Sequence, residues 1–209
     1  TVAFFKDSLN SITYPEEWVK DIKDVWKFYK DGHMLTVPHL HRYCGGRRTP
    51  DQQDLKHGGF SYDNWQEDND NIERLVEVFS SQWGRFEHNN HPMLLKAKSN
   101  VDGNTVTGFL NMGRRWGFTA SSDDHDGRPG YGGVTGVFAS NLTREDIFVG
   151  LYNRCTIAST HPRILVLYKI DEHFIGDIIT FDKIYNRARN INVTVLAPSL
   201  LAEVEIVKN

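Results

Sequence analysis

The chain has 209 residues, of which 39% are hydrophobic and 24% charged, and its formal net charge at neutral pH is −3. This length suits one large domain, or one and a half, with a sizeable core, and the composition is typical of a soluble globular protein. The weak negative charge argues against binding to duplex nucleic acid. No apolar run approaches the length of about 18 residues that a membrane-spanning helix needs, so we expect no contact with a membrane.

Other sequence-level signals are weak. The first residues do not resemble a signal peptide, because their apolar part is short and no basic region precedes it. The two cysteines, Cys44 and Cys155, match neither a zinc-binding spacing nor a disulfide framework, which leaves a single bridge open. The cellular compartment is therefore not indicated.

A helix and a short strand are predicted in the first part of the chain. Thr13 can cap a helix, apolar residues recur at helical spacing from Trp18 to Tyr29, and Gly32 stops the pattern. The apolar run 34–38 is typical of a strand, and His39 and His41 follow it directly. These imidazoles are candidate metal ligands. The alternative is a solvated basic loop, in keeping with the prolines and glycines around it.

A second strand is predicted at residues 75–80, after a long polar excursion over residues 49–72. Glu77 interrupts its apolar run. A carboxylate inside a buried strand is costly unless it is paired or bound to a metal, which makes Glu77 a candidate ligand. Periodicity alone equally allows an amphipathic strand in which Glu77 faces water.

The most distinctive stretch is the acidic loop, residues 121–130, which follows an apolar run at 116–120. Asp123 and His125 are two residues apart, so they point to the same side of an extended segment. A carboxylate oxygen and an imidazole nitrogen can together hold one divalent ion. The alternative is a turn in which Asp123 or Asp124 caps backbone amides and His125 is incidental.

The rest of the chain is predicted to change from mixed α/β to β-rich. We expect helices at 104–116 and 143–153 and strands at 134–139, 164–170, 175–181, 191–196 and 202–207. The alternation of helix, strand and loop favours an α/β domain with a largely parallel sheet over residues 1–160. Residues 161–209 would form a β-rich extension, in which His161 and His173 are surface or packing residues.

Three predicted strand ends thus carry imidazoles and carboxylates. This mixture suits zinc, manganese or iron and is too rich in nitrogen for calcium. Arg47, Arg48 and Arg128 lie beside these loops in the sequence. A guanidinium suits the phosphate or carboxylate of an anionic small-molecule substrate, although each arginine taken singly is better explained as a surface charge.

Several of these stretches resemble the PHP (polymerase and histidinol phosphatase) superfamily, and most closely its large, poorly characterised subgroup of PHP-like proteins. The stretches are Val37-Pro38-His39 and residues 75–80, 83–87, 118–130, 142–148 and 156–164. Together they cover most of residues 13–180, and the acidic loop is the most specific of them.

This resemblance implies part of a distorted β/α barrel, two or three divalent metal ions, and hydrolysis, often of phosphoesters. By match, Asp123 and His125 fall on the last metal-binding motif of the family, His39 on a middle one and Glu77 on the carboxylate position. It is open whether His39 or His41 is the ligand. The family's opening His-x-His motif is absent, so residues 1–160 would be the carboxyl-terminal part of a barrel, with the missing amino-terminal half of the same protein as a partner.

We therefore expect a metal-dependent hydrolase, with phosphoesters as the leading substrates. Its metal ligands would be His39, His41, Glu77, Asp123 and His125, and its catalytic residues Asp123, His125 and Arg128. One alternative is a metal-poor binding or structural module that kept the barrel, and another is a metal-dependent amide or ester hydrolase.

Overall fold

The computed structural model describes residues 2–6, 22–27, 32–38, 69–81, 84–87, 105–160, 163–180 and 188–208. The helices within them are α1 (Ile22–Lys27), α2 (Val106–Asn111) and α3 (Arg144–Tyr152). The strands are β1 (Val2–Phe5), β2 (Met34–Val37), β3 (Leu75–Ser80), β4 (Gly84–Arg85), β5 (Gly117–Ser121), β6 (Val134–Val137), β7 (Thr156–Ser159), β8 (Leu165–Ile170), β9 (His173–Phe174) and β10 (Ile191–Leu196). Among these residues, no helix combines the length and apolar character that crossing a bilayer requires.

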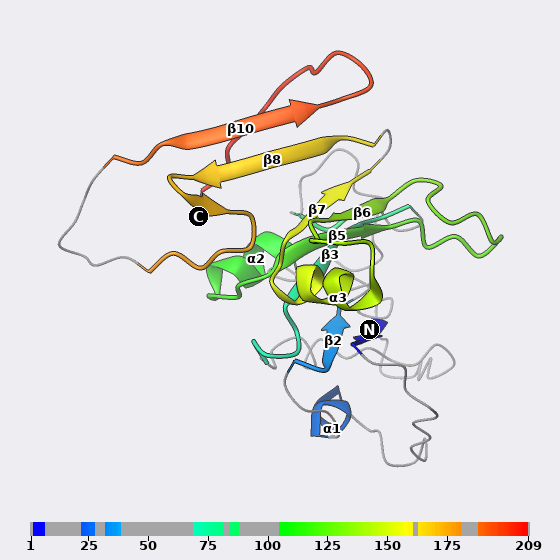
Figure 1. The fold of residues 1–209 in the computed structure, drawn as a ribbon. Helices are drawn as coiled ribbons and strands as arrows, with labels where there is room; N and C mark the ends of the chain where they lie inside the picture. The colour runs from blue at the N-terminus through cyan, green and yellow to red at the C-terminus, as the bar shows by residue number, and fades with distance from the viewer. Residues whose placement is uncertain are drawn as a thin grey trace, which may run out of the picture.

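The centre of the described structure is a sheet of three strands in the order β4-β3-β5 (Figure 1). β3 and β5 are parallel, and their register shifts between Glu77 and Phe79, so that Val78 forms a bulge. The antiparallel pair β6–β7 lies beside β5. The hydroxyl of Thr135 on β6 joins the two, because it donates to the carbonyl of Ala120 (2.8 Å) and accepts from its amide (3.0 Å).

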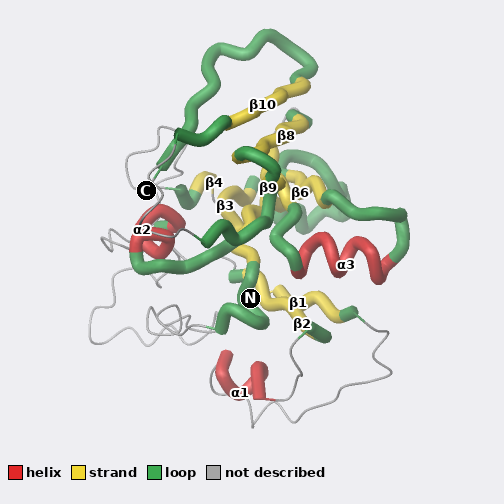
Figure 2. The backbone as a smooth tube through the Cα atoms, turned by 60° about the vertical axis from the view of Figure 1, so that its left-hand side comes forward, coloured by secondary structure: helices red, strands yellow, loops and turns green. Residues whose placement is uncertain are grey.

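Successive residues of β3 pack into different parts of the core, as the alternation of side chains along a strand requires. Val76 lies in a cluster with Phe109 of α2 and Trp116. Leu75 lies in a second cluster with residues of β2 and α3. Figure 2 shows α2 and α3 on opposite sides of the central strands. Burying one such aromatic or aliphatic side chain contributes about 1.5–3 kcal/mol, so β3 is anchored from both sides.

Local sequence explains where the two helices beside the core begin. Thr105 and Thr143 have extended backbone, and their side chains accept hydrogen bonds from the amides of Gly108 and Asp146. A threonine at this position satisfies one of the free amides of the first turn. The helix expected at 143–153 is confirmed, whereas the one expected at 104–116 ends at Asn111. Gly108 and Gly113 weaken the helix expected at 104–116.

The amino-terminal elements form a smaller unit. β1 and β2 pair antiparallel, and Trp26 of α1 packs against Met34 of β2 and Ile72. Its indole Nε1 donates to the hydroxyl of Thr36 (3.2 Å), which satisfies both polar groups inside the core. Of the helix expected from Thr13 to Gly32, residues 22–27 are described and are helical.

The last part of the chain forms a separate sheet of order β10-β8-β9, which Figure 1 shows above the central strands. The strands expected at 164–170 and 191–196 are confirmed by the antiparallel pairing of β8 with β10. The described residues of the strand expected at 175–181 form no strand, and neither do residues 202–207. Several apolar side chains there are exposed, among them Leu167, Leu196 and Val207.

The predicted β/α barrel with a largely parallel sheet is wrong. The described strands form four sheets of two or three strands each, and these sheets do not close into a barrel. Among the described pairs, β3 with β5 is parallel, while β1–β2, β3–β4, β6–β7, β8–β9 and β8–β10 are antiparallel. A barrel of this type needs consecutive parallel strands with staggered register all the way round, which antiparallel hairpins do not supply.

Candidate functional site

The parallel direction of β3 and β5 brings their carboxyl ends to the same edge of the sheet. Ser80 ends β3 and Ser81 follows it, and both lie beside Ser121, which ends β5. The acidic loop leaves β5 at this edge and returns to β6 at Val134. In open sheets with parallel strands, this edge is where ligands commonly bind. We define the carboxyl edge as Glu77, Ser80, Ser81, Ser121, Asp123 and His125.

Glu77 is buried, with 4% of its surface exposed. The hydroxyl of Ser121 on the neighbouring strand donates a hydrogen bond to its carboxylate. A hydrogen bond to a charged acceptor offsets part of the cost of removing the carboxylate from water. The alternative in which Glu77 faces solvent is therefore wrong, and its carboxylate is directed toward the end of β5.

Asp123 and His125 lie together in the loop. Imidazole Nε2 of His125 is 3.4 Å from carboxylate Oδ1 of Asp123, and the other oxygen, Oδ2, accepts from the hydroxyl of Ser80 (3.1 Å). The backbone of Asp123 is left-handed, with φ of 46°. Aspartate and asparagine tolerate this conformation better than most residues. The side chain of His125 is 78% exposed, so a ligand has access to this pair from solvent.

Asp124 has a different role from Asp123, because its carboxylate closes a turn. It accepts hydrogen bonds from the backbone amides of Asp126 (3.1 Å) and Arg128 (2.6 Å). Burial pushes the pKa of Asp124 up, but these two amides and the guanidinium of Arg128 outweigh it, so the pKa is lowered. The turn-capping alternative thus applies to Asp124, while Asp123 is directed to Ser80 and His125.

Arg128 is engaged within the same loop. Its guanidinium forms ion pairs with Asp124 and Asp126 and lies over the ring of Tyr131, 4.9 Å from the centroid. These contacts organise the loop. With 57% of the side chain exposed, an anionic substrate can still reach the guanidinium, and its expected role in substrate binding stays a prediction.

The far end of the loop is fastened to the carboxyl edge through Ser81. The hydroxyl of Ser81 accepts from the amide of Gly133 (2.9 Å) and donates to the carbonyl of Ser121 (3.4 Å). Gly133 has no room for a side chain, because a Cβ there would overlap that carbonyl and lie 2.8 Å from the ring of Phe79. The hydrogen bond between Ser80 and Asp123 therefore holds the start of the loop, and the one between Gly133 and Ser81 holds its end.

Part of the predicted metal-binding set is brought together and part cannot be placed. Within the described ranges, no three histidine, cysteine, aspartate or glutamate side chains are grouped closely enough to hold a metal ion. His39, His41, Arg47 and Arg48 lie outside the described residues. The carbonyl of Pro38, the residue before His39, accepts from the amide of Glu77 (3.4 Å), so the end of β2 runs beside β3.

The serines at this edge are site residues that sequence reasoning missed. Ser80 and Ser121 each bond to a predicted metal ligand. The signal was present as a pair of serines directly after each of two apolar runs, Ser80-Ser81 and Ser121-Ser122. Arg163 is another residue near the loop, since its Nη2 lies 3.6 Å from the position a Cβ would take at Gly130.

The chain is similar to proteins of Chlamydia over about three quarters of its length. No family model and no solved structure matches the chain. An uncharacterized protein of Chlamydia pneumoniae is 30% identical over 170 residues, which are 74% of this chain and 27% of that protein. An uncharacterized protein of Chlamydia trachomatis is 28% identical over 171 residues, 72% of this chain and 26% of that protein. The chain thus spans about a quarter of the length of these curated relatives.

Proposed function

We propose that the carboxyl edge binds a divalent metal ion and that the protein is a metal-dependent hydrolase acting on phosphoesters. The observation that carries this proposal is the approach of His125 Nε2 to Asp123 Oδ1 at 3.4 Å, on an edge where the carboxylate of Glu77 is also directed. Oxygen and imidazole nitrogen donors suit zinc, manganese or iron(II). The motif resemblance to the PHP superfamily points to the same chemistry, although not through a barrel.

The surroundings of these donors fit a metal ligand set in one further respect. Ligating carboxylates are usually held in place by hydrogen bonds to their second oxygen. Ser80 holds Asp123 in this way, leaving Oδ1 directed to His125, and Ser121 holds Glu77. A bound ion would supply Lewis acidity, which lowers the pKa of a water molecule and yields a hydroxide nucleophile near neutral pH. The chain's own residues would position that ion and, through Arg128, the anionic substrate.

The first test is metal content followed by turnover. The purified chain should contain zinc, manganese or iron, or take up manganese on addition, and should then hydrolyse a generic aryl phosphate. A chelator should remove this activity and added metal should restore it. Absence of bound metal and of metal uptake would refute the proposal and favour a binding module. Turnover of acyl esters or amides, with none of phosphoesters, would refute the phosphoesterase part alone.

A further inference from the structure

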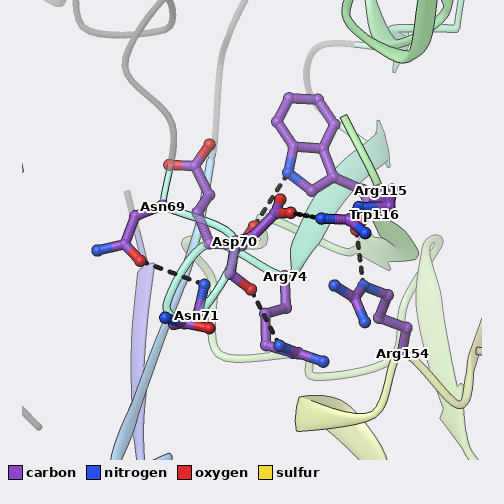
Figure 3. Close-up of polar contacts among 8 residues, drawn as sticks. Asn69, Asp70, Asn71, Arg74, Arg115, Trp116 and Arg154 are labelled. Atoms are coloured by element: carbon purple, nitrogen blue, oxygen red, sulfur yellow. Dashed lines mark hydrogen bonds and ion pairs between the residues drawn. The ribbon is translucent and has the colours of Figure 1, made fainter. Parts of the chain in front are cut away.

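Three arginines meet at the opposite, amino end of the same strands. Arg74 precedes β3, Arg115 lies two residues before β5, and Arg154 lies two residues before β7. Figure 3 shows the guanidinium of Arg154 between those of Arg115 and Arg74, with Asp70 beside them. We call Arg74, Arg115 and Arg154 the arginine cluster. None of these residues belongs to the carboxyl edge.

Contacts with the described residues hold each arginine by part of its guanidinium. Arg74 donates from Nε to the carbonyl of Tyr152 (2.5 Å) and from Nη1 to the carbonyl of Asp70 (3.0 Å), and lies 4.2 Å from the ring centroid of Tyr152. Arg154 donates from Nε to the carbonyl of Arg115 (2.6 Å). Its terminal nitrogens, Nη1 and Nη2, have no hydrogen-bond partner within the described residues.

The charges in this cluster are not balanced. Arg115 pairs with the carboxylate of Asp70. Among these four side chains, three positive charges therefore face one negative charge. Arg154 is 6% exposed. Burial, and then the like charge of Arg74, lowers the pKa of Arg154. The terminal nitrogens of Arg154 are not among the fully buried polar atoms that lack a partner, so solvent reaches them and a bound anion could accept hydrogen bonds from them. Such an anion would offset part of the cost of holding a guanidinium in a largely buried position.

The backbone conformation at Arg154 does not explain why an arginine occupies this position. Arg154 has a left-handed φ of 62°, directly after the end of α3. Its amide bonds to the carbonyl of Leu151 (3.0 Å), and the next amide, of Cys155, bonds to the carbonyl of Gly150 (2.9 Å). These two bonds form a Schellman motif, whose left-handed position is usually glycine. An arginine at this position has to be explained by its side chain.

We propose that the arginine cluster binds the phosphate group of a small molecule. Among the side chains of Arg74, Arg115, Arg154 and Asp70, the excess of two positive charges matches a phosphate, which carries a charge of about −1.5 to −2 at neutral pH. Guanidinium forks match phosphate oxygens with paired hydrogen bonds. Arg154 would be the buried anchor. Arg115, whose side chain is 54% exposed and whose pair with Asp70 is partly in solvent, would be the mobile entrance.

The test is isothermal titration calorimetry of the full chain with inorganic phosphate, at low ionic strength and with a chelator present, so that phosphate cannot bind through a metal ion. Arg154→Gly is the decisive variant, because glycine suits the left-handed backbone and keeps the helix end. We expect it to weaken phosphate binding by about tenfold or more. Lys169→Gln, which removes one exposed charge on β8, should leave the affinity unchanged.

A second titration, with acetate, tests whether the arginine cluster is specific for phosphate. Acetate, with one negative charge, should bind at least about tenfold more weakly than phosphate. Unchanged phosphate affinity in Arg154→Gly, equal affinity for acetate, or no binding up to about 1 mM phosphate would each overturn the proposal. Should Arg154→Gly not fold, Arg115→Gln, at the exposed side, replaces it under the same criteria. Since the chelator removes metal ions, the result does not depend on the proposed hydrolase activity.

Discussion

The two ends of the β3–β5 strand pair differ in the sign of their charge and in how their side chains are held. At the carboxyl edge, Glu77 and Asp123 are held by serine hydroxyls of the neighbouring strand, Ser121 and Ser80. At the amino end, arginines are held mainly by backbone carbonyls. Hydroxyl donors suit anions and carbonyl acceptors suit cations. The difference teaches that one pair of strands can present acidic side chains at one end and basic side chains at the other.

The largest expected effect is a loss of metal-dependent hydrolysis when Asp123 at the carboxyl edge is changed. Asp123→Asn keeps the left-handed backbone and an acceptor for Ser80 but removes the charge that a metal ion needs. Metal-dependent hydrolysis should fall by more than about 100-fold, since loss of outer hydrogen-bond partners alone costs about 10–100-fold at metal sites. Steady-state rates with manganese and metal analysis of the purified variant measure this.

A matched control for this change is Asp171→Asn, on another aspartate with left-handed backbone, φ 52°, in the turn after β8. It should retain full activity and normal metal content. Full turnover by Asp123→Asn would remove Asp123 from the catalytic set, and equal losses in both variants would trace the effect to backbone conformation.

The second prediction concerns the stability of the carboxyl edge. Gly133→Ala places a methyl group against the Ser121 carbonyl and the Phe79 ring, so the loop must move away from Ser81. We expect a loss of about 2–3 kcal/mol in the free energy of unfolding, as for overpacked sites, measured by urea denaturation. Gly127→Ala meets no atom within 4 Å but has φ of 75°, and should cost about 1 kcal/mol. A smaller loss for Gly133→Ala than for Gly127→Ala would contradict the tight fastening of the loop.

The third prediction concerns the left-handed backbone conformation at Arg154. Arg154→Gly and Arg154→Ala remove the same guanidinium, but alanine must adopt the left-handed conformation after α3. The glycine variant should be more stable than the alanine variant by about 1 kcal/mol in urea denaturation. Equal stability would mean that the helix end rearranges when the arginine is removed.

The smallest effect is a pH dependence in the acidic loop. The folded-state pKa of Asp124 is lowered, so its contribution to stability is complete above the unfolded pKa of about 3.9 and is lost as pH falls through the folded value. The difference in unfolding free energy between the wild type and Asp124→Asn should therefore shrink below about pH 4. A difference that stays constant across acid pH would show that the turn does not depend on ionisation of Asp124.

Short-range patterns predicted local elements well and their assembly poorly. Thr143 with Asp146 marked the start of α3, and the period-two runs marked β8 and β10. The pairing of strands depends on contacts between distant residues, such as Thr135 with Ala120 and Arg154 with Arg115, which periodicity does not encode. The barrel was inferred from motif resemblance, and antiparallel hairpins replaced its parallel strands.

The candidate site shows the same division. Asp123 and His125 were predictable because they are neighbours in sequence, and the structure brings them together. The serine partners were not predicted, because their roles arise from the pairing of β3 with β5. The arginine cluster was missed entirely, since Arg74, Arg115 and Arg154 are separated in sequence by about forty residues each and none stands in a recognisable motif.

The bulge in β3 has a consequence for changes in chain length. Val78 is passed over in the pairing, so that Glu77 lies opposite Thr119 and Phe79 opposite Ala120. Deleting Val78 would leave these pairings in place, because Phe79 would then follow Glu77 directly and still lie opposite Ala120, with Ser80 opposite Ser121. The strand can therefore lose one residue at the bulge without separating Ser80 from Asp123. A second deletion would have no unpaired residue to absorb it, so the register would slip by one position and every later side chain would turn to the reverse face.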